Sequence, residues 1–165
     1  MLYNHVRMNK VLLSIWKWLP FGLQRILSRI IMPSFQVFAV GVIFNSEKQI
    51  LLGKTTYQRV HPWGLPGGSL KIGEEPTKAV VREVWEETGL EIEVKKLLLA
   101  KNSSANDQIG LFYWCDILGG TFRPSDEMSE IRYFDLDNLP DVHPSDLKLI
   151  KELSEIVGVV NYELA

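Results

Sequence analysis

Three carboxylates crowd one face of a predicted helix. Glu83, Glu86 and Glu87 stand at positions i, i+3 and i+4, which place side chains on the same side of a helix. Hard divalent cations such as Mg²⁺ and Mn²⁺ take oxygen ligands, commonly a few carboxylates together with substrate phosphates. The absence of a His or Cys cluster beside them argues against zinc. A solvated acidic helix face has the same pattern, so the three residues alone leave metal binding and a plain surface both open.

A loop and a helix must position these carboxylates. Pro76 suits the first turn of a helix and Gly89 suits its C-terminal cap. Residues 56–74 are rich in proline and glycine, which predicts a structured loop before the helix. β-Branched and aromatic runs at 35–44 and 49–54 have the pattern of a hairpin. Further strands are predicted at 92–99, 109–118 and 131–134, and a last helix at about 145–157.

The loop and helix together resemble a known motif. Residues 68–90 read GSLKIGEEPTKAVVREVWEETGL, which is similar to the signature of the Nudix (MutT-like) hydrolases. The residues at its constrained positions are Gly68, Glu74, Arg82, Glu83, Val84, Glu86, Glu87, Gly89 and Leu90. Seven fixed identities at fixed spacing would arise by chance about once in 10⁸ starting points. The resemblance extends over roughly residues 35–158 and implies an α/β/α sandwich with a mixed sheet.

The resemblance implies a role for each polar residue of the motif. Glu83 and Glu87 correspond to the principal ligands of Mg²⁺ or Mn²⁺, and Glu86 joins the same cluster directly or through water. Gly68, or its neighbour Gly67, corresponds to the glycine whose backbone carbonyl completes the shell. Arg82 is similar to the arginine that steadies the carboxylates. For Glu74 we expect mainly a structural role, in bonds to backbone N–H groups.

The implied reaction is attack by a metal-activated water on a phosphorus of a pyrophosphate bridge. The substrate is a nucleoside diphosphate linked to a group X, or a (d)NTP. A general base must take the proton of that water, and the candidates are Glu83, Glu127 and Glu130. Spacing to Leu139-Pro140 favours Glu127 over Glu130. The catalytic set expected from the resemblance is therefore Arg82, Glu83, Glu86 and Glu127.

Substrate contacts outside the motif are weakly marked. Lys54 and Arg59 flank the glycine-rich loop and are candidates for binding phosphate. Trp63 is a candidate for stacking on a base, although a core aromatic is the favoured interpretation. Neither the proline typical of ADP-ribose enzymes nor the tyrosine typical of dinucleoside polyphosphate enzymes follows the motif, where the chain has Ser-Ala-Asn-Asp at 104–107. The group X therefore stays open.

The segment before the motif differs in charge. Residues 1–33 carry about +5 with no Asp or Glu, whereas the chain as a whole has a net charge of −2. Residues 10–32 have an amphipathic helical pattern that Pro20-Phe21-Gly22 interrupts, and Pro33 is expected to end it. We therefore predict a basic helical extension at 1–33 before a hydrolase domain at 34–165. Its apolar face fits packing on the domain or on a second subunit as a homodimer, the favoured interpretation, or peripheral membrane contact.

Two other functions stay open. The chain could be a nucleotide-binding or sensing module docked at a membrane surface or a partner, although the complete glutamate set argues for catalysis. An RNA 5′-end pyrophosphohydrolase is a minor alternative. The acidic balance after residue 33 counts against a stable nucleic-acid partner.

The sequence also predicts a location. No apolar run is long enough to span a bilayer, and no signal-peptide cleavage pattern follows the first apolar residues. The single Cys115 fits a reducing compartment. We expect a cytoplasmic protein, with peripheral contact at the inner face of the membrane as the alternative.

Overall fold

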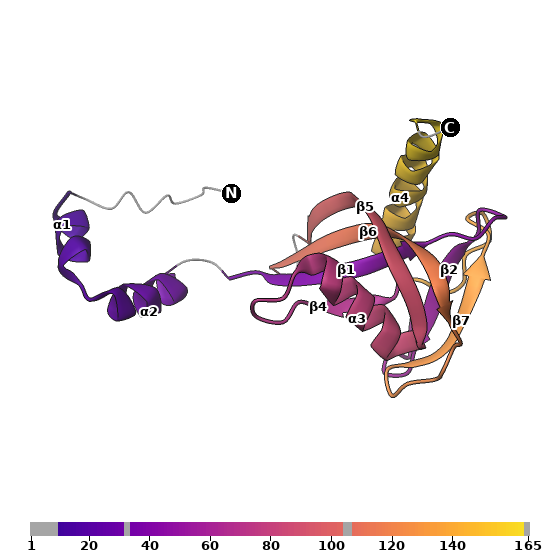
Figure 1. The fold of residues 1–165 in the computed structure, drawn as a ribbon, viewed down its shortest axis with the longest axis horizontal. Coiled ribbons are helices and arrows are strands. Elements are labelled where there is room, and N and C mark those ends of the chain that lie inside the picture. The colour runs from indigo at the N-terminus through magenta and orange to yellow at the C-terminus, as the bar shows by residue number, and fades with distance from the viewer. Residues whose placement is uncertain (1–9, 32–33, 104–106, 164–165) are drawn as a thin grey trace. The chain divides into compact units, whose positions relative to one another are not determined.

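The computed structural model describes residues 10–31, 34–103 and 107–163, and the chain divides into two units, Met1–Phe35 and Gln36–Ala165. The first unit contains α1 (Lys10–Trp18) and α2 (Phe21–Ile31), separated at Pro20 as expected (Figure 1). The side-chain amide of Gln24 donates to the carbonyls of Trp16 (2.8 Å) and Leu19 (3.0 Å) and so ties the two helices together. The predicted stop at Pro33 lies outside the described residues.

The second unit contains a mixed four-stranded sheet in the order β4-β1-β6-β5. Its strands are β1 (Gln36–Ile43), β4 (Gly67–Ser69), β5 (Leu90–Ser103) and β6 (Gln108–Gly120). β1 pairs with β6 in parallel and with β4 antiparallel, while β5 and β6 are antiparallel. The strands therefore join segments that lie far apart in the sequence, as parallel pairing requires.

A second, three-stranded sheet has the order β3-β2-β7, all antiparallel. It is built from β2 (Ile50–Thr55), β3 (Trp63–Gly64) and β7 (Met128–Phe134). The predicted hairpin of 35–44 with 49–54 is wrong, because β1 and β2 share only the single bridge Phe44–Ile50 and then enter different sheets. Both edges of β1 are already occupied by β4 and β6, so β2 pairs with β7 instead.

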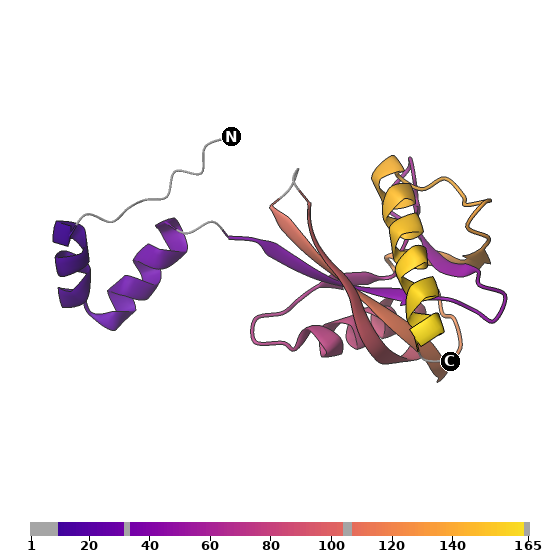
Figure 2. The same cartoon turned by 90° about the horizontal axis from the view of Figure 1, so that it is seen from above.

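Two helices cover the strands, α3 (Pro76–Thr88) and α4 (Pro144–Glu163) (Figure 2). Leu51 packs in the core cluster that contains Ala79, Val80 and Val84 of α3, whereas its neighbours Ile50 and Leu52 pack with Ile150 and Leu153 of α4. Successive residues of a strand point to opposite faces, so the strand lies between the two helices. The predicted α/β/α sandwich with a mixed sheet is confirmed.

The ends of α3 fix where its carboxylates lie. Pro76 stands in the first turn, and Gly89 closes the helix with a φ of 73° and an N–H that donates to the Trp85 carbonyl at 2.8 Å. Glycine adopts this left-handed conformation without the steric cost that a Cβ brings. Ala79, Val80 and Val84 are buried in the core, whereas Glu83 and Glu87 lie on the side of the helix that faces the preceding loop.

Candidate active site

Two of the glutamates of α3 converge on the Gly67-Gly68 dipeptide. The Gly67 N–H donates to Glu87 Oε2 at 2.9 Å, and a Cβ on Gly68 would lie 2.5 Å from the Glu83 carboxylate. Gly67 pairs with Val40 of β1, so close that a Cβ there would lie 2.4 Å from the Ala39 carbonyl oxygen. Only glycines permit this approach of the loop to both the sheet and the carboxylates.

Arg82 joins the carboxylates to the loop. Its guanidinium donates to both oxygens of Glu74 (2.7 and 2.8 Å), to Glu83 Oε1 (2.7 Å) and to Glu86 Oε2 (3.0 Å), and it also reaches the Ser69 carbonyl at 3.1 Å. These bonds, the pair to Glu74 first, raise the pKa of Arg82. Arg82 thus fixes the position of Glu83 and Glu86 relative to the loop.

Glu74 has the structural position expected for it. Its carboxylate accepts from the Lys71 N–H at 2.9 Å as well as from Arg82. The Arg82 hydrogen bonds, followed by the Lys71 N–H, lower its pKa to about 2. Glu74 therefore stays ionised and holds the loop turn at 71–74 against the start of α3.

The electrostatics of Glu87 differ from those of its neighbours. Burial, followed by the negative charges of Glu83, Glu127 and Glu86, raises its pKa to about 7, against the lowering effect of the Gly67 N–H. A buried carboxylate next to other carboxylates is destabilised when ionised. A cation among them removes that cost.

The donor set fits a hard divalent cation. Within the ranges that the structure describes, no three acidic, His or Cys side chains stand close enough together to form a metal site as they are placed. Glu83 instead bonds to Arg82, and Glu87 bonds to the Gly67 N–H. Both carboxylates nevertheless face the same dipeptide, whose backbone carbonyls are oxygen ligands of the kind that Mg²⁺ and Mn²⁺ take. The residues therefore fit the cation that the sequence implies.

The loop that carries Glu127 is tied to this cluster. Ser125 Oγ donates to the backbone carbonyl of Glu87 at 3.1 Å and accepts from the Met128 N–H at 3.0 Å. The Thr56 N–H donates to the Glu127 carbonyl at 2.9 Å. The charge of Glu127 contributes to the raised pKa of Glu87. Glu127 accordingly lies beside the carboxylates of α3, although it follows Glu87 by forty positions in the sequence.

Glu130, the other loop candidate, has different surroundings. It stands on β7 opposite Lys54 of β2 and forms an ion pair with Arg132. The charges that raise the pKa of Glu87 are those of Glu83, Glu127 and Glu86, not that of Glu130. Of the two candidates, Glu127 is the one that the fold brings to the cluster.

The three predicted substrate contacts stand on β2, on β3 and in the segment between them. Trp63 packs among the core residues beneath α4, with its ring edge-on to Phe134 at a centroid distance of 4.9 Å. Lys54 Nζ lies 6.0 Å from the centroid of the Trp63 ring. Arg59 is exposed in the segment between β2 and β3. For Trp63 this packing agrees with the favoured interpretation, a core aromatic.

Sequence reasoning missed Tyr57, Thr56 and Ser125. The Tyr57 side chain is 65% exposed, and its pKa is raised by partial burial and by the charges of Glu87 and Glu127. Tyr57 therefore lies near the carboxylates and offers a hydroxyl to a bound substrate. No motif in the sequence links these residues to α3, because the contacts depend on how the two loops return to the helix.

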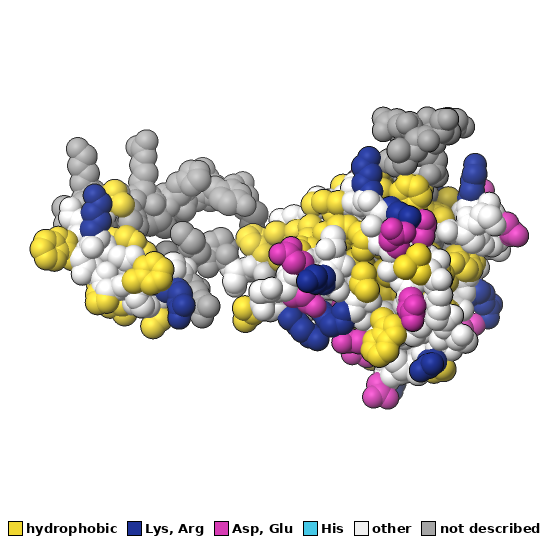
Figure 3. Space-filling view, in the orientation of Figure 1, with side chains coloured by type: hydrophobic (Ala, Val, Ile, Leu, Met, Phe, Trp, Pro, Cys, Tyr) yellow, Lys and Arg dark blue, Asp and Glu magenta, His cyan; other side chains and the backbone are white. Residues whose placement is uncertain are grey.

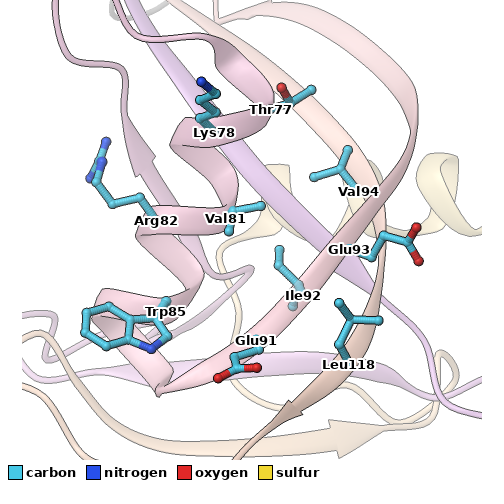
Figure 4. A pocket seen from close by; sticks show the side chains of 10 residues that line it. All are labelled: Thr77, Lys78, Val81, Arg82, Trp85, Glu91, Ile92, Glu93, Val94 and Leu118. Carbon is cyan, nitrogen blue, oxygen red and sulfur yellow. The ribbon is translucent and has the colours of Figure 1, made fainter.

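A groove of about 590 Å³ lies on another side of α3. Figure 4 shows Val81 and Trp85 of the helix on one wall, facing Ile92, Val94 and Leu118 of β5 and β6. Glu83, Glu86 and Glu87 do not line it. Arg82, which bonds to Glu83 and Glu86, does line the groove, so the groove borders the carboxylate cluster without containing its carboxylates.

The raised pKa of Glu87 predicts a pH-dependent stability in metal-free protein. In the native state Glu87 keeps its proton up to about pH 7, whereas the ordinary pKa of a glutamate side chain is 4.5. The native state then binds more protons than the unfolded state between these values, so the free energy of unfolding falls as pH rises from about 4.5 to 7. Urea denaturation in EDTA at pH 5, 6 and 7 should show a loss of about 2 kcal/mol between pH 5 and pH 7. Glu87→Gln should flatten this slope, and an unchanged slope would contradict the prediction.

Known proteins resemble this chain over the same region. A family model described as NUDIX domain matches residues 35–153. An ADP-ribose pyrophosphatase of Methanocaldococcus jannaschii is 35% identical over 116 residues, 68% of this chain and 69% of the relative. A MutT-like protein of Streptomyces ambofaciens is 31% identical over 65% of this chain and 68% of its own length. The crystal structure of an ADP-ribose pyrophosphatase of Streptococcus suis, 28% identical, superposes with a TM-score of 0.64 over 75% of this chain and 91% of that chain.

Proposed function

The chain belongs to the Nudix family of pyrophosphohydrolases, and we propose that it hydrolyses a phosphoanhydride bond in a nucleoside diphosphate linked to X, or in a (d)NTP, with Mg²⁺ or Mn²⁺. The observation that carries this proposal is the convergence of Glu83 and Glu87 on Gly67-Gly68, with Glu127 beside them. A pyrophosphate bridge and a divalent cation are the partners that such a cluster suits.

Each residue then has a task in the reaction. Glu83, Glu87 and the Gly68 carbonyl would hold the cation, and Glu86 would join them directly or through water. The cation, when bound, neutralises phosphate oxygens and acidifies water. Arg82 holds Glu83 and Glu86 in place through the bonds described above. Glu127 takes the proton of the attacking water as its oxygen bonds to phosphorus, while the bridging oxygen leaves with the other phosphate.

The substrate is a nucleotide-type small molecule. Two of the relatives above are named ADP-ribose pyrophosphatases, which makes ADP-ribose the first compound to test. Lys54, Arg59 and Tyr57 are candidates for contacts to the phosphates or to X, since all three stand on or directly after β2, next to the Glu127 loop. The proline typical of ADP-ribose enzymes is absent at the expected spacing, so a wider panel is needed.

The test is turnover by wild-type protein with Mg²⁺, Mn²⁺ or EDTA. The panel contains ADP-ribose, nucleotide sugars, CDP-alcohols, dinucleoside polyphosphates and (d)NTPs, with a 5′-triphosphorylated RNA oligonucleotide added. Coupled phosphatase or pyrophosphatase reveals either type of product. We expect metal-dependent hydrolysis of one small-molecule class. Turnover of the RNA alone would favour an RNA pyrophosphohydrolase, and nucleotide binding without turnover would favour a sensing module.

A further inference from the structure

The N-terminal unit exposes large apolar side chains on both of its helices. Trp18 is 90% exposed and Phe21 is 80% exposed, on either side of the break at Pro20. Leu13 and Ile15 of α1, and Leu23 and Ile26 of α2, are also exposed. Ile15 and Trp18 stand three positions apart, as do Leu23 and Ile26, so each pair shares a helix face. The unit itself does not bury these faces.

The polar side chains of this unit have only one charge sign. Lys17 lies away from the face of Ile15 and Trp18 and on the side of Leu13, and Arg25 lies away from the face of Leu23 and Ile26 and on the side of Phe21. No Asp or Glu occurs in residues 1–33, which carry about +5. On the face shown in Figure 3 the unit displays hydrophobic and basic side chains and no acidic ones. Protein-covered helix faces usually mix both signs at their rim, whereas this one does not.

Short amphipathic helices with Lys and Arg on one side and Trp, Phe and Leu on the other lie in the interface plane of a bilayer. No helix within the described residues is long and apolar enough to cross a membrane. A second copy of this segment is a poor partner, because it brings the same positive charge and no carboxylate to pair with it. Anionic headgroups supply the missing negative charge and attract Lys and Arg side chains near the surface.

We propose that α1 and α2 dock this protein on a lipid bilayer with anionic headgroups. Trp18 and Phe21 insert at the level of the headgroups, as aromatic side chains do at membrane interfaces. Lys17 and Arg25 face the phosphates. The proposal does not depend on the substrate of the catalytic unit, and it places a nucleotide hydrolase at a membrane surface.

The experiment is co-sedimentation of the full chain with vesicles. One set contains phosphatidylcholine alone and the other contains phosphatidylglycerol and phosphatidylcholine in equal parts. The full chain should bind the anionic vesicles and lose binding as salt increases. Trp18→Ala/Phe21→Ala should lower the partition coefficient at least about 10-fold, because two large apolar side chains are truncated. Lys17→Glu/Arg25→Glu should abolish the preference for anionic vesicles. The matched control is Ile72→Ala/Val60→Ala, which truncates exposed apolar residues of the catalytic unit.

Three results would overturn the proposal. The first is that the wild-type chain fails to bind anionic vesicles. The second is that the control pair weakens binding as much as Trp18→Ala/Phe21→Ala does. The third is that vesicle binding is absent and sedimentation velocity shows a dimer, which the Trp18→Ala/Phe21→Ala substitutions dissociate. That result would assign the apolar face to a second copy of the chain. Nucleotide hydrolysis in solution should be unchanged in both N-terminal variants, so failure here is distinct from failure of the proposed reaction.

Discussion

Glu87→Gln should lower kcat at least about 1000-fold, because loss of a cation ligand removes several kcal/mol of transition-state stabilisation. The glutamine has nearly the same volume and can still accept the Gly67 N–H bond that Glu87 Oε2 accepts at 2.9 Å. The fold should therefore survive, and metal-free protein at pH 7 and above should become more stable, since an unfavourable buried charge is removed. The measurements are steady-state kinetics and Mn²⁺ binding by calorimetry.

The matched control for Glu87→Gln is Glu75→Gln. Glu75 is the exposed N-cap residue of the same helix, and its side chain makes no capping hydrogen bond. This substitution should change kcat and Mn²⁺ affinity by less than about twofold, as expected for a surface position. A Glu87→Gln protein that keeps activity within tenfold of wild type, or that binds Mn²⁺ unchanged, would show that Glu87 is not a ligand.

Local patterns in the sequence predicted the helix that carries the site. The i, i+3, i+4 spacing placed Glu83, Glu86 and Glu87 on one face, and Pro76 and Gly89 marked both ends of α3 where the structure has them. These features depend on contacts within one turn of helix, which sequence spacing specifies directly. The same holds for the break between α1 and α2 at Pro20.

Non-local pairings were not predictable in this way. The run at 49–54 is apolar and was predicted as a hairpin partner for β1, but the strand pairs with β3 and with β7, which lies about eighty positions later. Whether β1 pairs with β2 or with β6 depends on the whole sheet, which a local pattern does not contain. For the same reason the approach of Tyr57 and Ser125 to Glu87 had no signal in the sequence.

We expect Glu127 to be the general base, because one of these non-local contacts brings its loop to α3. Glu127→Gln should lower kcat about 100- to 10,000-fold while leaving Mn²⁺ affinity nearly unchanged, because a base that accepts a proton in the transition state contributes that much. The loop stays in place through backbone atoms, since the Thr56 N–H bonds to the Glu127 carbonyl and not to its side chain.

Glu130→Gln is the matched control for this base, because Glu130 stands three positions later and pairs with Arg132 on the strand. It should leave kcat within about threefold of wild type, as exposed ion pairs contribute little.

Ser125→Ala distinguishes the role of the Glu127 carboxylate from that of the loop that carries it. This substitution removes the hydrogen bond to the Glu87 carbonyl without altering any charge. It should lower kcat less than Glu127→Gln does. If Glu130→Gln causes the larger loss, the base lies on β7. If neither glutamine variant is impaired, Glu83 is the remaining candidate, and the tether of the Glu127 loop to α3 is structural only.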